Sequence, residues 1–142
     1  MIREAKITDY VELQKLSSED LGYKCDAELI KTRLENLDFN NECVFVADVN
    51  CEVVGYVHII KFNTLYYKSM ANIQGMVVSK EYQRKGYGKE LMNAAENWAR
   101  ERNIEMVRLN SGFVRPEAHE FYRAIGYNNE KEQIRKERFD NG

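Results

Sequence analysis

Two spacings of hydrophobic residues alternate along the chain and predict strands and helices in turn. The runs Glu42–Val49 and Glu52–Phe62 are rich in Val, Ile, Phe and Tyr and meet near Asn50, which predicts a β-hairpin. Similar apolar runs, and one polar run at the end of the chain, predict four shorter strands at 2–6, 71–78, 106–110 and 131–139.

Hydrophobic residues three or four positions apart predict four helices between these strands. Asp9 and Asp26 stand where N-caps are expected for the first two, and Pro116 and Gly126 begin and end the last. The third, at 89–102, has the clearest pattern, and loops are expected at 17–24 and 63–69. The four apolar stripes are Tyr10, Leu13, Leu16; Ile30, Leu34, Leu37; Leu91, Ala94, Ala95, Trp98, Ala99; and Ala118, Phe121, Tyr122, Ile125.

The order of these elements, β-α-α-β-β-β-α-β-α-β, predicts the fold class. An antiparallel first half followed by strand-helix-strand units indicates an α/β protein of the mixed α+β type, with one mostly antiparallel sheet flanked by about four helices. The chain has 142 residues, of which 44% are hydrophobic. This size fits a single domain, 1–142.

The net charge and the cysteine content limit the classes of function that the chain can have. The net charge of -2 gives no overall positive field, which argues against a nucleic-acid partner. The charged N-terminus and the short apolar run 53–60 argue against a signal peptide and a membrane partner. Cys25, Cys43 and Cys51 form no CxxC pair, so we expect neither a disulfide framework nor a metal site, but small buried residues in a reducing cytoplasm.

The segment Gln83-Arg84-Lys85-Gly86-Tyr87-Gly88 joins a predicted strand to the clearest helix. Free N–H groups at a helix N-terminus attract anions, and glycines let a diphosphate approach the backbone. The turn lacks the Gly-Lys-Ser/Thr of a P-loop, and its first glycine follows Val78 too late for a dinucleotide-binding turn. On its own, a Gly-x-Gly pair is more often a plain solvated turn.

The elements on either side of this turn, and a second motif later in the chain, indicate what the turn binds. Gln83-x-x-Gly86-x-Gly88, with its preceding strand and following helix, resembles the coenzyme A motif of the GNAT superfamily of N-acetyltransferases. The later segment Phe121-Tyr122-Arg123-Ala124-Ile125-Gly126-Tyr127 is similar to that superfamily's Phe-Tyr-x-x-x-Gly-Phe. Two motifs in the right order are more specific than one.

The resemblance implies that acetyl-coenzyme A is the co-substrate, without a metal, and that its pantetheine arm enters a gap between splayed strands 71–78 and 106–110. Tyr122 would face the sulfur as general acid. The implied cofactor-binding residues are Met76, Val77, Val78, Gln83, Arg84, Lys85, Gly86, Tyr87, Gly88, Lys89 and Arg115.

The base that deprotonates the amine is less clear from the sequence. Many family members have a carboxylate on the strand before the turn, where this chain has Gln74. A glutamine amide cannot take the proton, so we expect either deprotonation through an ordered water or binding of an already neutral amine. His119, one helical turn before Tyr122, is the alternative base or orienting group, whereas His58 is expected to be structural.

The acceptor is expected to be a small-molecule or peptide amine. The segments 17–26 and 63–69, which in such folds overhang the acceptor, contain acidic and aromatic residues that suit a cationic amine: Glu19, Asp20, Asp26, Tyr23, Tyr66 and Tyr67. The resemblance also makes a homodimer the common assembly. Two other classes compete with an enzyme: a non-catalytic acyl-coenzyme A sensor, suggested by Gln74, and a nucleic-acid adaptor, disfavoured by the net charge.

Overall fold

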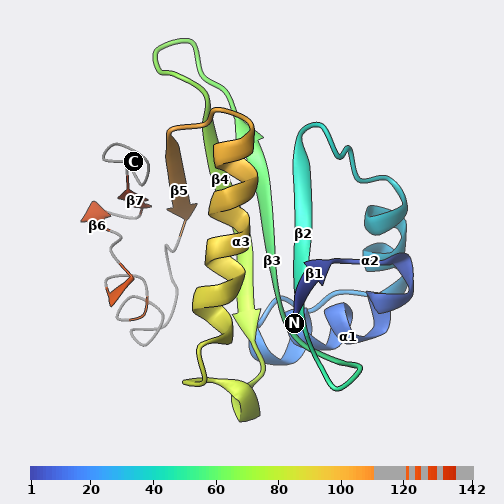
Figure 1. The fold of residues 1–142 in the computed structure, drawn as a ribbon. Coiled ribbons are helices and arrows are strands. Elements are labelled where there is room, and N and C mark those ends of the chain that lie inside the picture. The colour runs from blue at the N-terminus through green and yellow to red at the C-terminus, as the bar shows by residue number, and fades with distance from the viewer. Residues whose placement is uncertain (111–120, 122–123, 126–127, 131–132, 137–142) are drawn as a thin grey trace.

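A computed structural model gives the fold of the chain and describes residues 1–110, 121, 124–125, 128–130 and 133–136 (Figure 1). The described strands form one sheet in the order β1-β2-β3-β4-β5-β7-β6. Only the β4–β5 pair is parallel among them, which confirms the predicted mixed, mostly antiparallel sheet. The strands are β1 Ile2–Glu4, β2 Glu42–Val49, β3 Glu52–Phe62, β4 Met70–Val78, β5 Met106–Asn110, β6 Asn128–Glu130 and β7 Gln133–Lys136.

Helices cover both faces of this sheet. The longest of the described helices, α3 (Tyr87–Glu101), buries its apolar stripe against β2, β3, β4 and β5. A second core joins α1 (Tyr10–Lys15) and α2 (Ala27–Glu35) to the opposite face. Successive strand residues point to opposite faces, so Val78 belongs to the α3 core and its neighbour Val77 to the α1–α2 core.

Most predicted elements are confirmed, two differ in detail, and one lies mostly outside the described residues. The loop expected at 17–24 begins as a π-helix, η2 (Leu16–Asp20), which continues α1 without a break. The terminal strand expected at 131–139 is described as β7 and pairs with a further strand, β6. The helix expected at 116–126 lies mostly outside the described residues, although the Ile125 N–H donates to the Phe121 carbonyl oxygen at 3.2 Å, as in a helix.

The three cysteines are free thiols, and the expectation that all three are buried is wrong. Cys43 is buried, Cys25 is half-buried and Cys51 is exposed. Cys51 follows Asn50 in the β2–β3 turn, and both have positive φ, as expected of a tight hairpin turn. Burial, together with the nearby Glu4 carboxylate, raises the pKa of the Cys43 thiol to about 12, so this thiol stays protonated at neutral pH.

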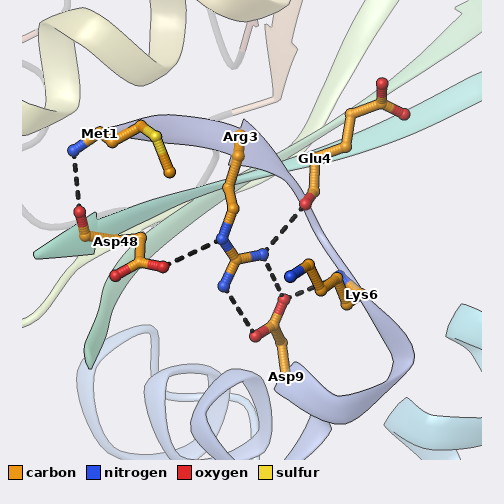
Figure 2. Close-up of polar contacts among 6 residues, drawn as sticks. All are labelled: Met1, Arg3, Glu4, Lys6, Asp9 and Asp48. Atoms are coloured by element: carbon orange, nitrogen blue, oxygen red, sulfur yellow. Dashed lines mark hydrogen bonds and ion pairs between the residues drawn. The ribbon is translucent and has the colours of Figure 1, made fainter. Parts of the chain in front are cut away.

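A network of charged groups ties the N-terminal strand to the rest of the fold (Figure 2). The Arg3 guanidinium donates two hydrogen bonds to the Asp9 carboxylate, at 2.9 and 3.0 Å, and one to Asp48 of β2 at 3.0 Å. The Asp9 carboxylate also accepts from the Lys6 N–H at 2.7 Å. Asp9 was expected to cap α1 but makes no side-chain cap there, because the Arg3 and Lys6 donors occupy it. Asp26 does cap α2, as predicted.

This network should make stability depend on pH at acidic values. Burial disfavours the Asp9 charge, but the hydrogen bonds from Arg3 and Lys6 outweigh it and leave the pKa below its usual 3.8. A lowered folded-state pKa stabilises the protein above the unfolded value, and this contribution is lost as pH falls through the folded value. Asp9→Asn should therefore cost about 2 kcal/mol at pH 7 in urea unfolding, and the difference should shrink below about pH 4.

A matched control is Glu105→Gln, which removes an exposed ion pair with Lys68. Exposed pairs contribute little, so this change should cost less than about 1 kcal/mol. If the Asp9→Asn difference were the same at pH 7 and pH 3, the Asp9 charge would not be what stabilises the network.

Candidate functional site

The sheet opens between β4 and β5. β4 pairs with β5 only through its first four residues, Met70–Ile73, and then continues to Val78 paired with β3 alone. No described strand lies against the other side of residues 74–78. The expected separation of the two strands is therefore present, and it begins at the centre of β4.

The hydrogen-bonding pattern of β4 determines which backbone groups face this opening. The Ser79 N–H donates to the Val54 carbonyl at 2.8 Å, and residues of an antiparallel pair alternate in direction. Val77 therefore bonds to β3, while Met76 and Val78 direct their N–H and C=O groups away from β3, into the opening. The Gln83 amide nitrogen donates to the Val78 carbonyl oxygen at 3.0 Å. The Gln83 side chain thus fixes the start of the glycine turn.

The turn itself prepares an anion site. Arg84 and Gly86 both have positive φ, 64° and 91°, and Gly86 is the N-cap of α3. The first intrahelical acceptor is the Gly86 carbonyl, bonded by the Glu90 N–H at 3.1 Å. The N–H groups of the first turn, from Tyr87 to Lys89, therefore have no intrahelical acceptor. They lie at the positive end of the α3 dipole.

The two glycines serve different purposes. A Cβ on Gly86 would meet no atom within 4 Å, so this position is open and glycine is needed for its backbone conformation. A Cβ on Gly88 would lie 3.1 Å from the Phe121 ring, so this position is closely packed. Phe121, the first residue of the second sequence motif, therefore lies against the start of α3. Gly88 and Phe121 lie 33 positions apart in the chain and are neighbours in the fold.

The basic side chains of the turn are exposed, and one of them has a partner. The Lys85 ammonium lies 5.4 Å from the centre of the Tyr82 ring, which also meets Tyr87 edge to face. The Glu52 carboxylate raises the pKa of the Tyr82 phenol. Lys85 therefore holds its positive charge over the Tyr82 ring, next to the glycine turn.

Gln74 lies at a β-bulge. β3 and β4 shift register between His58 and Ile59, so His58 pairs with Gly75 and Ile59 pairs with Ile73, which leaves Gln74 without a partner residue in β3. The Gln74 side-chain oxygen accepts a hydrogen bond from the Asn72 amide. Bulges re-aim side chains next to active sites, and this one presents Gln74 at the point where β4 and β5 separate.

The two loops expected to surround the acceptor do not come together. The first reaches the bulge, since a Cβ on Gly75 would lie 3.5 Å from Leu21. The Ser17 hydroxyl is 2.7 Å from the Tyr56 hydroxyl, and the Asp20 carboxylate accepts from the Lys80 N–H at 3.2 Å. The loop 63–69 lies at the opposite end of β4, away from the start of α3 (Figure 1). Of these two loops, the first alone contacts the region of the bulge.

Three predicted site residues, Arg115, His119 and Tyr122, lie outside the described residues. Among the residues that are described, no three His, Cys, Asp or Glu side chains gather closely enough to hold a metal ion. Within the same residues, no helix is long and apolar enough to cross a membrane.

Asn72 and Tyr56 are additional residues of this region that the sequence did not predict, and His58 was expected to be only structural. Asn72 is buried, and its side-chain oxygen has no hydrogen-bond partner in the described part of the chain. Burial raises the pKa of the Tyr56 phenol, and the hydrogen bond with Ser17 only partly offsets this rise. Asn72 lies two positions from Gln74, and Tyr56 lies two positions from His58. Because residues two apart on a strand share a face, this spacing could have identified Asn72 and Tyr56 as neighbours of the predicted residues.

Comparison with known proteins agrees with this arrangement. Residues 10–127 match the model of the Acetyltransferase (GNAT) family. An uncharacterized N-acetyltransferase of Chlorobaculum tepidum is 28% identical over 97% of this chain and 79% of its own length. An aminoalkylphosphonate N-acetyltransferase of Salmonella typhimurium is 28% identical over 89% of this chain and 91% of its own. A crystal structure of an aminoglycoside acetyltransferase from an uncultured soil metagenomic sample, in complex with trehalose, superimposes with a TM-score of 0.73 and 27% identity, covering 92% of this chain and 90% of that one.

Proposed function

The chain belongs to the GNAT family of acetyltransferases, and on that premise we propose that it transfers an acetyl group from acetyl-coenzyme A to a primary amine. The amine attacks the thioester carbonyl directly. The observation that carries this proposal is the opening between β4 and β5 beside the N-terminus of α3. A cofactor with a peptide-like arm and a diphosphate suits both features.

The proposed cofactor pose follows from the backbone. Pantetheine amides would pair with the outward N–H and C=O groups of Met76 and with the Val78 N–H, because the Gln83 side chain already occupies the Val78 carbonyl. The diphosphate would accept hydrogen bonds from the first turn of α3, with the Lys89 charge nearby. Gly86 leaves room for this approach.

The proposed chemistry has three requirements: a neutral amine, donors for the oxyanion, and a hydrogen bond or proton for the departing thiolate. We assign the last to Tyr122, whose neighbour Phe121 packs at Gly88 beside the proposed diphosphate site. The Gln74 amide lies where the amine would approach, on the bulge of β4. Its oxygen already accepts from Asn72, which leaves its amide nitrogen to hold a water or the acetyl oxygen.

The proposed acceptor is a small amine. The named relatives, an aminoalkylphosphonate N-acetyltransferase and an aminoglycoside acetyltransferase, carry the names of small amino compounds. Both the aminoalkylphosphonate class and the aminoglycoside class are therefore suitable starting points for a panel of acceptors. The free thiols of the described residues accord with a reaction in the cytoplasm.

Thiol release from acetyl-coenzyme A across such a panel tests the proposal. The wild type should turn over at least one amine, and Tyr122→Phe should lower kcat by about 100-fold while it retains binding of acetyl-coenzyme A. Tyr66→Phe is the matched control, since Tyr66 is exposed on the distant loop, and it should match the wild type. Cofactor binding without turnover of any amine would instead favour the sensor function.

A further inference from the structure

The proposed reaction lacks a group that can take the proton of the amine. Amines are mostly protonated at neutral pH and attack only as the free base. Gln74 cannot accept a proton, and its side-chain oxygen is held by Asn72. In strands β3 and β4, the His, Asp and Glu residues are Glu52, at the far hairpin end, and His58. His58 is therefore the residue to examine.

The bulge places His58 beside Gln74 on one face of the sheet. Val57 and Ile59 pack into the α3 core, so His58, between them, points to the opposite face. Ala71 and Ile73 likewise belong to the α3 core, which directs Asn72 to the same face as His58. His58 pairs in register with Gly75, directly after Gln74.

Glu42 holds the imidazole in a defined orientation. Its carboxylate oxygen lies 2.7 Å from the His58 Nε2, and only 9% of the Glu42 side chain is exposed. A carboxylate accepts hydrogen bonds, so Nε2 carries the hydrogen and Nδ1 keeps its lone pair. Nδ1 makes no hydrogen bond among the described residues, and the imidazole is 21% exposed, so water can reach it.

The surroundings also keep this histidine neutral. Burial lowers the pKa of His58 below its usual 6.5, and Glu42 only partly opposes that effect. Arg33 of α2, whose guanidinium is 3.5 Å from the same Glu42 oxygen, lowers it further. The polar side chains that β4 presents on this face are the neutral amides of Asn72 and Gln74, and β5 adds the positive charge of Arg108, which pairs in register with Asn72. A neutral imidazole at pH 7 has a lone pair available for a proton.

We propose that His58, oriented by Glu42, accepts the proton of the acceptor amine through a water molecule held at Gln74. This inference rests on the proposed function. The ammonium loses one proton to His58 Nδ1, and the free amine attacks the acetyl carbonyl to form the N–C bond. The C–S bond then breaks, Tyr122 stabilises the departing thiolate by its hydrogen bond, and the second proton of the nitrogen reaches the sulfur, so that the free thiol leaves. His58 returns its proton to solvent. Glu42 is a positioning residue, which stabilises the imidazolium.

Kinetics with an amine that the wild type acetylates test this role. His58→Gln should lower kcat by about 100-fold at pH 7. It should also remove the acidic limb of the kcat/KM profile, which in the wild type should have its midpoint below the usual histidine pKa of 6.5. Glu42→Gln should keep a limb but move it to lower pH, because Glu42 raises the His58 pKa. Both variants should keep the stabilisation by acetyl-coenzyme A, which shows that they are folded.

Two results would overturn the inference while leaving the proposed function intact. One is a wild-type rate in His58→Gln, and the other is loss of the acidic limb of kcat/KM in His119→Gln but not in His58→Gln. A wild type that acetylates no amine would remove the proposed function and this inference together. Nitrogen-15 NMR gives an independent test that needs no acceptor, because the chain has two histidines. The His58 ring should be the Nε2–H form, and finding hydrogen on Nδ1 alone would contradict the proton path.

Discussion

Substituting valine for Gly86 should abolish the stabilisation of the protein by acetyl-coenzyme A. At a hundred times its dissociation constant, the cofactor should add about 2.7 kcal/mol to the wild type, measured as a shift in thermal unfolding. Valine cannot adopt the φ of 91° without strain, and its branched side chain would fill the open approach to the first turn of α3. The variant should fold, because no atom lies within 4 Å of the new Cβ.

Gly22 provides a matched control for this experiment. It has the same φ of 91° and the same empty surroundings, but it lies in the loop before α2. Gly22→Val should therefore carry a similar backbone cost, about 1–3 kcal/mol, and keep the full cofactor shift. Gly88 is a poorer choice than Gly86, because a side chain there would meet Phe121 and disturb packing as well as binding. An undiminished shift in Gly86→Val would contradict the proposed diphosphate site.

Replacing Gly55 with alanine should destabilise the fold by about 3 kcal/mol in urea unfolding. The new Cβ would lie 2.8 Å from the Val77 carbonyl oxygen, a backbone atom that can move only if β3 and β4 shift. It would also press against Leu91 of α3 at 3.2 Å. The change therefore strains the strand pair and the α3 core at once.

Gly75→Ala tests whether close approach, rather than glycine itself, causes this loss. Its Cβ would meet Leu21 at 3.5 Å, an ordinary contact, so the cost should stay within about 1 kcal/mol. Equal losses in the two variants would show that the contact with Val77 does not decide the stability of the sheet.

The glycine turn could be predicted because it depends on local sequence. Gly86 has the left-handed backbone that glycine permits, and α3 begins at the next residue. Asp26 likewise caps α2 through a contact two residues away. Asp9 shows the limit of such reasoning, because its partner Arg3 is itself fixed by Asp48, 45 residues farther along the chain. A local capping pattern cannot reveal that competition.

The bulge at Gln74 could not be predicted from the sequence. The positions of His58 and Gln74 relative to each other depend on this bulge. The residue pattern of β3 and β4 fits strands in either register, and only their pairing shows that Gln74 is the additional residue. Without that register, His58 and Gln74 could not be assigned to neighbouring positions on one face. The role of Tyr122 remains a prediction from the resemblance.

The separation of β4 from β5 also bears on self-association. Unpaired strand edges attract other chains, and here the edge lies inside a sheet rather than at its border. Among the described residues the unpaired length of this edge is short, since Met76 and Val78 direct backbone groups outward beyond the bulge and the Gln83 side chain already occupies one acceptor. An edge with so few free groups offers a second polypeptide little to pair with, while it still suits a ligand that needs only a few hydrogen bonds.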